Sequence, residues 1–280
     1  MTDEQIYVKI TGGLGNQLFG LAAGLEQANR LGCGLVLLTN NYRPGGTRKF
    51  SLDQLHLPSH VSVLNESKRP RFFARRKTFR EKGFSYDPSV FSVRPGMVME
   101  GYFQSPKYFP NTKDLLRELV FPQDWVSESL DESIVPFTAV HVRRGDYLEA
   151  KTRAFHGVVG PSYFRNSLEL LGRLNGFNRT IVFTDSPSHV RDEISLFGQG
   201  AELFSPDTEV DELETIRVMG RASRIVISNS SFSWWAAWKI SCDAPLDGSI
   251  RVACPRPWFA SGESAADLLA PNWVSFGWDD

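Results

Sequence analysis

Short apolar runs alternate with helical stretches through the second half of the chain, and this alternation constrains the fold more than any other feature. Runs at residues 138–142, 180–183 and 224–228 are separated by stretches whose apolar residues recur with helical spacing. Strands buried on both faces of a parallel sheet form uninterrupted apolar runs, and helices connect them. The second half is therefore predicted to be a parallel α/β sheet with helical crossovers.

The first half of the chain begins with the same alternation. An apolar run at residues 6–10 leads into a glycine-rich turn and a helical stretch, and a second apolar run follows at 35–38. Because a typical domain has roughly 150 residues, a chain of 280 residues is long enough for two lobes. We therefore expect two Rossmann-like lobes, at residues 1–125 and 126–280.

Composition limits the partners and the compartment that we expect. The chain has 31 basic and 32 acidic residues and a net charge of −1, which excludes a protein that binds nucleic acid mainly through charge. Its three cysteines lack Cys-x-x-Cys spacing, so neither a disulfide framework nor a cysteine zinc site is expected, and a reducing cytoplasm is the default. No window approaches the roughly 18 apolar residues of a membrane span, and the polar first residues predict no signal peptide.

Polar clusters follow four of the expected strands at their carboxyl ends. These clusters occupy residues 11–17, 143–146, 184–186 and 228–235. In parallel α/β sheets, ligands bind beyond the carboxyl ends of the strands, where loops lead into helix N-termini. The four clusters therefore predict the lining of a ligand-binding cleft.

The first cluster, Gly12-Gly-Leu-Gly-Asn-Gln17, is a glycine-rich turn at the start of a helix. Its glycines let the backbone approach an anion or a sugar oxygen, and the amides of Asn16 and Gln17 suit the same ligands. A nicotinamide dinucleotide is an alternative ligand, but its fingerprint requires a glycine where this chain has Leu18. The other alternative is that Asn16 only caps the helix.

The second cluster, His141-Val-Arg-Arg-Gly-Asp146, places two guanidinium groups at the end of a buried strand. Such charges are costly to bury unless an anion meets them. Asp146 can pair with one arginine, and a bound diphosphate would accept two hydrogen bonds from the other. The chain has no Asp-x-Asp sequence. In a transferase that releases a nucleoside diphosphate, such a chain would stabilise the leaving group with arginines and amides rather than with a carboxylate-bound metal. The alternative is an Arg–Asp network that only closes a loop.

The last two clusters offer further ligand contacts. Asp185 directly follows a strand, and its carboxylate suits either a ribose or guanine contact or a helix N-cap. Ser230 and Ser231 precede a helix, where hydroxyls and amides suit a phosphate-binding turn. Serines also cap helices routinely, and Trp235 and Trp238 are expected in the core.

Together these segments resemble the bacterial α-1,2-fucosyltransferases, glycosyltransferase family 11. The resemblance rests on motifs that stand in the family's order: Gly12-Gly-Leu-Gly-Asn-Gln-Leu-Phe19, His141-Val-Arg-Arg-Gly-Asp-Tyr147, Phe155-His-Gly157, Phe183-Thr-Asp185 and Ser228-Asn-Ser-Ser-Phe-Ser-Trp-Trp235. It implies an α/β GT-B fold, with two Rossmann-like lobes and a donor-binding cleft between them. It also implies inverting transfer of L-fucose from GDP-fucose, as co-substrate, to the 2-hydroxyl of galactose, with no cofactor and no metal.

The resemblance also assigns roles to residues at matching positions. Arg143 and Arg144 would bind the donor diphosphate and act in catalysis. The other donor-binding residues that it implies are Gly13, Gly15, Asn16, Gln17, His141, Asp185, Asn229, Ser230, Ser231 and Phe232. Acceptor contacts are implied for Asn16, Tyr147, His156 and Trp234. The candidates for the catalytic base are Asp146, Glu149 and His156, and a route without a base is the alternative.

A basic segment at residues 68–82 carries eight basic residues and one acidic residue, together with Phe72, Phe73 and Phe79. This composition fits a surface that contacts an anionic membrane, where a galactose-terminated or lipid-linked glycan acceptor would be displayed. We therefore expect a cytoplasmic enzyme of O-antigen or related oligosaccharide biosynthesis, peripheral to the inner face of the plasma membrane. The alternative is a solvated charged loop.

Three other functions stay open on the sequence. The chain could be a GDP-sugar fucosyltransferase that makes an α-1,6 or a protein O-linked product. It could be a nicotinamide-dependent oxidoreductase, although the broken glycine pattern argues against this class. It could be a non-catalytic glycan-binding protein, for which two arginines at a strand end would serve no purpose.

Overall fold

The computed structural model describes residues 4–42, 46, 48–65, 75–127, 129–131, 134–176, 179–204, 211–244 and 248–279. The chain divides into two compact units, Met1–Gln123 with Ala266–Leu268, and Asp124–Ala265 with Leu269–Asp280. Residues 266–268 group with the first unit rather than with the rest of 126–280. One contact that holds them there is the Asp267 carboxylate, which accepts a hydrogen bond from the Tyr86 N–H at 2.9 Å.

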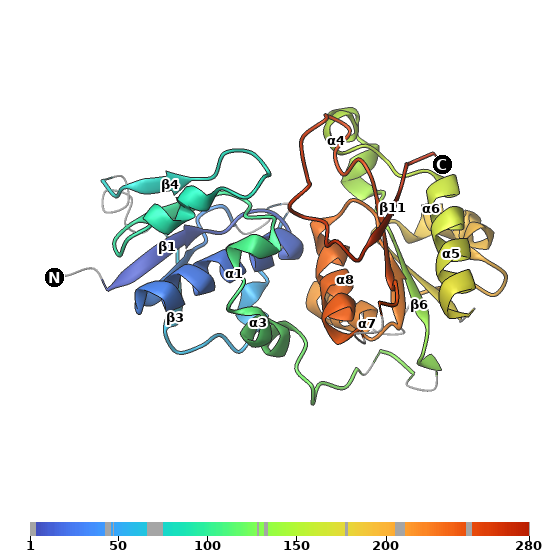
Figure 1. Ribbon diagram of the computed structural model, residues 1–280, viewed down its shortest axis with the longest axis horizontal. Helices are drawn as coiled ribbons and strands as arrows, with labels where there is room; N and C mark the ends of the chain where they lie inside the picture. Colours follow the sequence, from blue (N-terminus) through green and yellow to red (C-terminus); the bar gives the residue numbers. More distant parts are fainter. Residues whose placement is uncertain are drawn as a thin grey trace. The chain divides into compact units, whose positions relative to one another are not determined.

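The first unit is built on a parallel sheet with the strand order β3-β2-β1-β5-β4. Its strands are β1 (Gln5–Lys9), β2 (Gly34–Leu38), β3 (Val61–Leu64), β4 (Thr78–Arg80) and β5 (Val98–Glu100). Its helices are α1 (Leu14–Leu31) and α3 (Lys113–Val120), with 3-10 segments η1 (Leu52–Gln54), η3 (Pro88–Ser92) and η4 (Pro106–Tyr108). Figure 1 shows α1 against this sheet, where it packs on β1 and β2.

Helix α1 forms where apolar residues recur with helical spacing. Leu18, Leu21 and Leu25 are fully buried, because this face of the helix packs against the sheet. Gly13 is its N-cap, and the helix ends at Gly32, whose φ of 61° is the left-handed conformation that glycine adopts readily. The glycine-rich turn therefore lies at the carboxyl end of β1, as a Rossmann-like unit requires.

The second unit is built on a parallel sheet with the order β11-β10-β9-β6-β7-β8. Its strands are β6 (Thr138–Val142), β7 (Thr180–Thr184), β8 (Glu202–Leu203), β9 (Arg224–Val226), β10 (Val252–Pro255) and β11 (Val274–Phe276). Numbered from its own first strand, the sheet has the order 3-2-1-4-5-6 of the doubly wound Rossmann fold. Strands β6 and β9 are adjacent, so the direction of winding reverses between them, and such switch points are where these sheets bind ligands.

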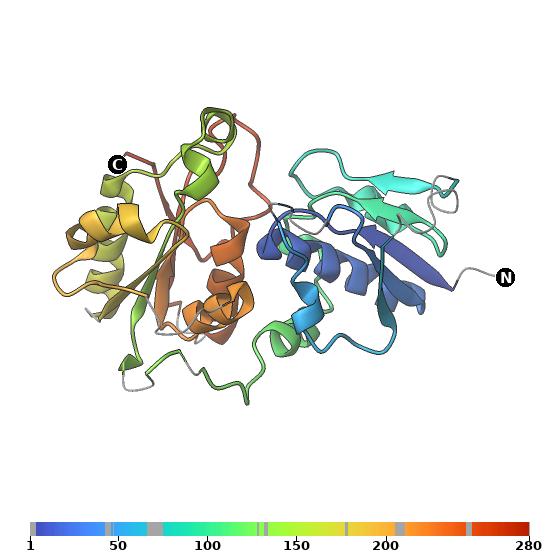
Figure 2. The same ribbon diagram turned by 180° about the vertical axis from the view of Figure 1, so that it is seen from behind.

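Helices cover both faces of the second sheet (Figures 1 and 2). Helices α5 (Pro161–Asn175) and α6 (Pro187–Asp192) lie on one face, and α7 (Glu212–Gly220) and α8 (Ser231–Asp243) lie on the other. The remaining segments are α4 (Ala150–His156), η6 (Gly145–Leu148) and η7 (Ile194–Phe197). Val140, Val182 and Val226, one from each of three neighbouring strands, are fully buried in the core.

The structure confirms the predicted α/β class and parallel sheets, and it differs from the sequence prediction in short elements. Strands β3 and β4 are not among the strands predicted from the sequence, because each is short and partly exposed. The helical stretch after β7 is interrupted, since α6 is followed by the 3-10 segment η7. Among the described helices, none is both long and apolar enough to cross a bilayer.

The basic segment at residues 68–82 is described only from residue 75 onward, so Phe72 and Phe73 lie outside the described residues. Phe79 corrects our expectation of a membrane-facing ring. It belongs to β4, is 7% exposed and packs against Phe103 with ring centroids 6.4 Å apart. Arg80, two-thirds exposed, pairs with Glu100 at 3.1 Å.

Candidate active site

The predicted site of the second unit lies where β6 and β9 end side by side. Their pairing matches Val140 with Val226, so the loops that follow both strands leave the same edge of the sheet. Ser228 connects these loops through its hydroxyl, which accepts a hydrogen bond from the Arg143 N–H at 3.0 Å and donates one to the His141 carbonyl at 2.8 Å. The second and fourth polar clusters therefore form one structure at the switch point.

Arg143 carries the accessible guanidinium group of this edge. Its Nη2 lies 2.5 Å from Asp146 Oδ1, and its Nη1 lies 3.0 Å from Asp185 Oδ2. Burial alone would lower the pKa of Arg143, but the charges of Asp185 and Asp146 raise the pKa above its ordinary value. The side chain is 16% exposed, so a diphosphate could reach a cation that two carboxylates already orient.

Arg144 differs from Arg143 in its surroundings, although the resemblance assigned both arginines to the donor diphosphate. Its Nη1 donates to the carbonyl of Val159 at 3.2 Å, and its Nη2 lies 3.8 Å from Glu193. Burial lowers the pKa of Arg144, which Glu193 partly offsets, and its side chain is 9% exposed. The Arg144 guanidinium thus holds the segment before α5, because alternate residues at the end of a strand point to opposite faces.

Asp185 joins the two arginines from the end of β7. One oxygen pairs with the Arg143 side chain, and the other accepts the Arg144 backbone N–H at 2.9 Å. Gly145 makes this approach possible, since a Cβ at that position would lie 2.2 Å from Asp185 Oδ2. Sequence reasoning did not single out Gly145, although its place between Arg144 and Asp146 was a usable signal.

The loop after β6 continues into a stack of Tyr147 and His156. Their rings are 4.7 Å apart and 15° from parallel, and the Arg143 guanidinium lies 5.3 Å from the Tyr147 ring centre. Burial lowers the pKa of His156; Asp146 opposes this effect and Arg143 reinforces it. A lowered pKa favours the neutral imidazole at neutral pH, which is the form that can accept a proton.

Asn229 holds this stack in place from the loop after β9. Its Nδ2 donates to the His156 carbonyl at 2.6 Å and to the Trp258 carbonyl at 3.1 Å, and its own carbonyl accepts the Tyr147 hydroxyl at 3.0 Å. The Oδ1 atom of Asn229 is buried without a hydrogen-bond partner. The Asn229 side-chain nitrogen therefore joins the loop after β9 to His156 and Trp258. Of the side-chain atoms of Asn229, Oδ1 is the one left without a hydrogen bond.

His141 is the second polar side chain of this edge with a buried, unpartnered atom. Its Nδ1 lacks a hydrogen-bond partner, and its ring lies 5.6 Å from the ring of Phe232. Burial, with a further contribution from Arg143, lowers the pKa of His141 to about 3. The imidazole is therefore neutral at neutral pH, and its buried Nδ1 is an unused hydrogen-bonding atom at this edge.

The start of α8 corrects one predicted acceptor contact. Ser230 is the N-cap, and its hydroxyl accepts the Phe232 N–H at 3.3 Å. Trp234 is 1% exposed and packs edge-on against Trp235 with ring centroids 5.2 Å apart. Because helical periodicity turns Trp234 toward the core, it offers no accessible surface to an acceptor. Ser231 and Phe232 remain partly exposed at the helix start.

In the glycine-rich turn of the first unit, the side-chain amides of Asn16 and Gln17 have different surroundings. Gln17 is fully buried, and its Nε2 donates to the carbonyls of Gly12 at 3.1 Å and Lys49 at 2.7 Å. Its amide therefore fastens the turn, which corrects its assignment as a ligand contact. Asn16 is partly exposed, and its Oδ1 accepts a hydrogen bond from Gln104 Nε2 at 2.8 Å.

Sequence reasoning missed three further residues beside the predicted ones. Gln104 donates a hydrogen bond to Asn16. Arg48 lies beside the glycine-rich turn, since an ideal Cβ on Gly13 would lie 3.8 Å from its Nη1. Trp278 covers the Phe155-His-Gly157 motif, since a Cβ on Gly157 would lie 2.1 Å from its ring. All three come from loops or from the end of the chain, where no periodic pattern marks them.

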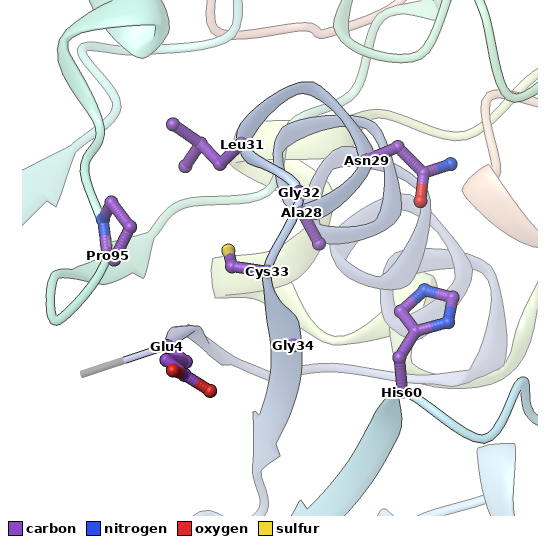
Figure 3. A pocket seen from close by; sticks show the side chains of 9 residues that line it. All are labelled: Glu4, Ala28, Asn29, Leu31, Gly32, Cys33, Gly34, His60 and Pro95. Carbon is purple, nitrogen blue, oxygen red and sulfur yellow. The ribbon is translucent and has the colours of Figure 1, made fainter. Parts of the chain in front are cut away.

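Other predicted residues and other pockets contribute little to this edge. Glu149 is the exposed N-cap of α4. A pocket in the first unit is lined by Glu4, Ala28, Asn29, Leu31, Gly32, Cys33, Gly34, His60 and Pro95 (Figure 3). It lies at the amino ends of β1 and β2, opposite the edge where these sheets bind ligands. Within the described residues, no three His, Cys, Asp or Glu side chains gather as a metal-ion site.

Two parallel α/β units, the second with a cationic switch point, have the architecture of the GT-B fold. Residues 89–275 match the sequence profile of Glycosyl transferase family 11, and the chain belongs to this family.

The chain is similar to curated bacterial glycosyltransferases over nearly its whole length. It is 28% identical to an alpha-1,2-colitosyltransferase of Escherichia coli, over 96% of this chain and 98% of the relative. It is 22% identical to the O-antigen biosynthesis glycosyltransferase WbnK of Escherichia coli, over 96% of this chain and 100% of the relative. A galactoside alpha-(1,2)-fucosyltransferase 1 of Leontocebus fuscicollis is 27% identical over 51% of this chain and 39% of the relative.

The fold is also similar to that of a solved fucosyltransferase. A crystal structure of NodZ alpha-1,6-fucosyltransferase, soaked with GDP-fucose, superposes with a TM-score of 0.50 at 14% identity, covering 84% of this chain and 91% of that one. At this identity the likeness concerns the fold alone.

Proposed function

We propose that this glycosyltransferase moves L-fucose from GDP-β-L-fucose to the 2-hydroxyl of a galactose residue, with inversion and without a metal. The observation that carries the proposal is the partly exposed Arg143 guanidinium at the β6–β9 switch point, oriented by Asp146 and Asp185. The relatives named for α-1,2 transfer support the linkage, and the galactoside alpha-(1,2)-fucosyltransferase supports the acceptor.

Arg143 would stabilise the GDP leaving group. As the bond between the sugar and the diphosphate breaks, negative charge grows on the diphosphate, and a preoriented cation lowers the free energy of that state. The Asp146 side chain is 36% exposed, so a diphosphate can replace it as the hydrogen-bond acceptor of Arg143. Asp185 would meanwhile keep the guanidinium in place. His141 Nδ1 and the start of α8 would contact the nucleotide beside it.

His156 is the base that the geometry favours for the acceptor hydroxyl. Asp146 is paired with Arg143, and Glu149 is exposed at the start of α4. His156 is partly buried and stacks on Tyr147 beside Arg143, with a pKa that burial lowers. Inverting transfer passes through an oxocarbenium-like state in which the hydroxyl loses its proton late. The variant His156→Gln should lose transfer but keep GDP binding, and unchanged transfer would exclude this base.

A second donor is favoured by the 28% identical relative, which is named an alpha-1,2-colitosyltransferase. Colitose lacks the 3-hydroxyl of fucose, so a site that hydrogen-bonds this hydroxyl discriminates strongly against colitose. Turnover of GDP-fucose and GDP-colitose, measured side by side on one acceptor, decides between the two donors.

The test of the main proposal is GDP-fucose turnover against a panel of β1,3- and β1,4-linked galactosides, with a peptide acceptor for comparison and with or without EDTA. We expect a Fuc-α1,2-Gal product and an unchanged rate in EDTA. Transfer to the peptide alone would point to protein O-fucosylation, and loss of the rate in EDTA would contradict the metal-free mechanism.

The biological acceptor that we propose is a lipid-linked O-antigen glycan at the cytoplasmic face of a bacterial membrane. The support is the relative named for O-antigen biosynthesis and the basic segment at residues 68–82, of which Arg75, Lys77 and Lys82 are exposed. Flotation with anionic liposomes should show binding at low salt that high salt removes. No binding at low salt would rule out the membrane contact.

A further inference from the structure

A strained turn follows β5 in the first unit. Phe103 has a φ of 52°, and among the described residues it is the one non-glycine residue with a positive φ. A bulky side chain in this region costs free energy, and such a conformation persists only where the surroundings hold it.

Glu81, from the segment after β4, holds this turn. Its Oε2 accepts the backbone N–H groups of Tyr102 at 2.7 Å and Phe103 at 2.8 Å. Gly101 permits the close approach, because a Cβ there would lie 2.5 Å from the Glu81 Cβ. The turn is therefore built by specific contacts from a neighbouring strand.

The consequence of this turn is that two adjacent aromatic residues face opposite ways. Phe103 is fully buried and packs edge-on against Tyr108, with ring centroids 5.3 Å apart. Tyr102 is 40% exposed and stacks on Phe84 at 5.8 Å, with ring planes 16° apart. The structure thus keeps a flat aromatic ring at the surface, supported from one side by a second ring.

The turn also ends at the residue that positions Asn16. Strands β5 and β1 are paired neighbours, so their carboxyl ends lie at the same edge of the sheet. Gln104, the last residue of the turn, is 7% exposed and donates to Asn16 Oδ1 at 2.8 Å. Tyr102 and the predicted contact residue Asn16 therefore belong to one connected structure at the ligand-binding edge of the first unit.

We propose that Tyr102, supported by Phe84, is an acceptor subsite on which a pyranose ring of the glycan stacks. A pyranose such as galactose has one face made of C–H groups, which packs on an aromatic ring while the hydroxyls at its rim stay hydrated or hydrogen-bonded. An exposed aromatic pair on a rigid turn offers this surface at little cost in conformational entropy. This inference rests on the proposed transfer to a glycan acceptor.

The experiment compares Tyr102→Ala, Tyr102→Phe and the control Phe91→Ala, which removes another exposed ring of the first unit, 51% exposed. Initial rates are measured with GDP-fucose and with lactose, Gal-β1,3-GlcNAc, Gal-β1,4-GlcNAc or methyl β-galactoside. We expect Tyr102→Ala to raise the acceptor KM about five- to tenfold. The kcat and the donor KM should stay near wild type, and both Tyr102→Phe and Phe91→Ala should resemble the wild type.

Saturation-transfer NMR of the same sugars with GDP present supplies a readout apart from turnover. The proposal predicts that sugar signals weaken in Tyr102→Ala and persist in Tyr102→Phe. If the wild type transfers fucose and Tyr102→Ala behaves as Phe91→Ala does, the subsite is wrong and the proposed function stands. If the wild type transfers to none of these sugars, the proposed acceptor class fails and the subsite fails with it.

Discussion

At the scale of single residues, neighbouring positions with the same chemistry have different tasks. Arg143 and Arg144 are both arginines at the end of β6, yet Arg143 pairs with partly exposed carboxylates while Arg144 donates to the buried carbonyl of Val159. Asn16 and Gln17 differ in the same way, since Gln17 is fully buried. Residue type alone therefore does not identify a ligand contact, and the direction of the side chain decides.

This difference predicts distinct phenotypes for the two arginines. Arg143→Ala should lower kcat/KM about a hundredfold or more, because a preoriented charge at the leaving group is lost. Arg144→Ala should instead lower the free energy of unfolding by about 1–3 kcal/mol, because buried carbonyls lose their donor. Steady-state kinetics and urea denaturation of both variants separate these effects, and equal kinetic losses with unchanged stability would contradict the division.

His141 predicts how stability depends on pH. Burial lowers its pKa to about 3, whereas the unfolded chain binds a proton near its ordinary pKa. The stability that the neutral imidazole contributes is therefore present above about pH 6.5 and is lost as the pH falls toward 3. Urea denaturation between about pH 7 and pH 5 should show a shallower loss in His141→Gln than in wild type. An unchanged slope in His141→Gln would refute the expectation.

At the scale of elements, α8 shows how a motif is shared between site and core. Its first residues lie at the switch point, whereas Trp234, Trp235 and Trp238 pack against one another inside the second unit. The sequence predicted core positions for Trp235 and Trp238 but not for Trp234. The resemblance to a family motif assigned it to the acceptor because sequence position does not reveal which face a helix turns inward.

The variant Trp234→Ala should therefore affect stability rather than acceptor binding. Deleting a buried indole leaves a cavity, and the free energy of unfolding should fall by about 3–5 kcal/mol. The acceptor KM of the fraction that remains folded, measured at low temperature, should match wild type. A selective rise in that KM with unchanged stability would return Trp234 to the acceptor site.

At the scale of the whole molecule, two sheets of the same class carry different ligand-binding edges. The second unit has a cation and paired carboxylates at its switch point, and the first has the Asn16–Gln104 pair and an exposed aromatic turn. This division predicts the class of nucleotide that stabilises the protein. GDP at 100 times its Kd should add about 2.7 kcal/mol to the free energy of unfolding and raise the Tm. NAD at the same concentration should leave the Tm unchanged, and a larger shift with NAD would favour an oxidoreductase.

The sequence by itself determined the α/β class, where the main strands lie along the chain and which strand ends carry polar groups. These features follow from local periodicity and from residues that are neighbours along the chain. Tertiary structure alone decided that Ser228 joins the loops after β6 and β9, that Gly145 admits Asp185, and that Gln104 holds Asn16. Each of these contacts joins segments far apart in the sequence or depends on the direction of a side chain. No local pattern encodes either property, because both arise only when the sheets and helices pack.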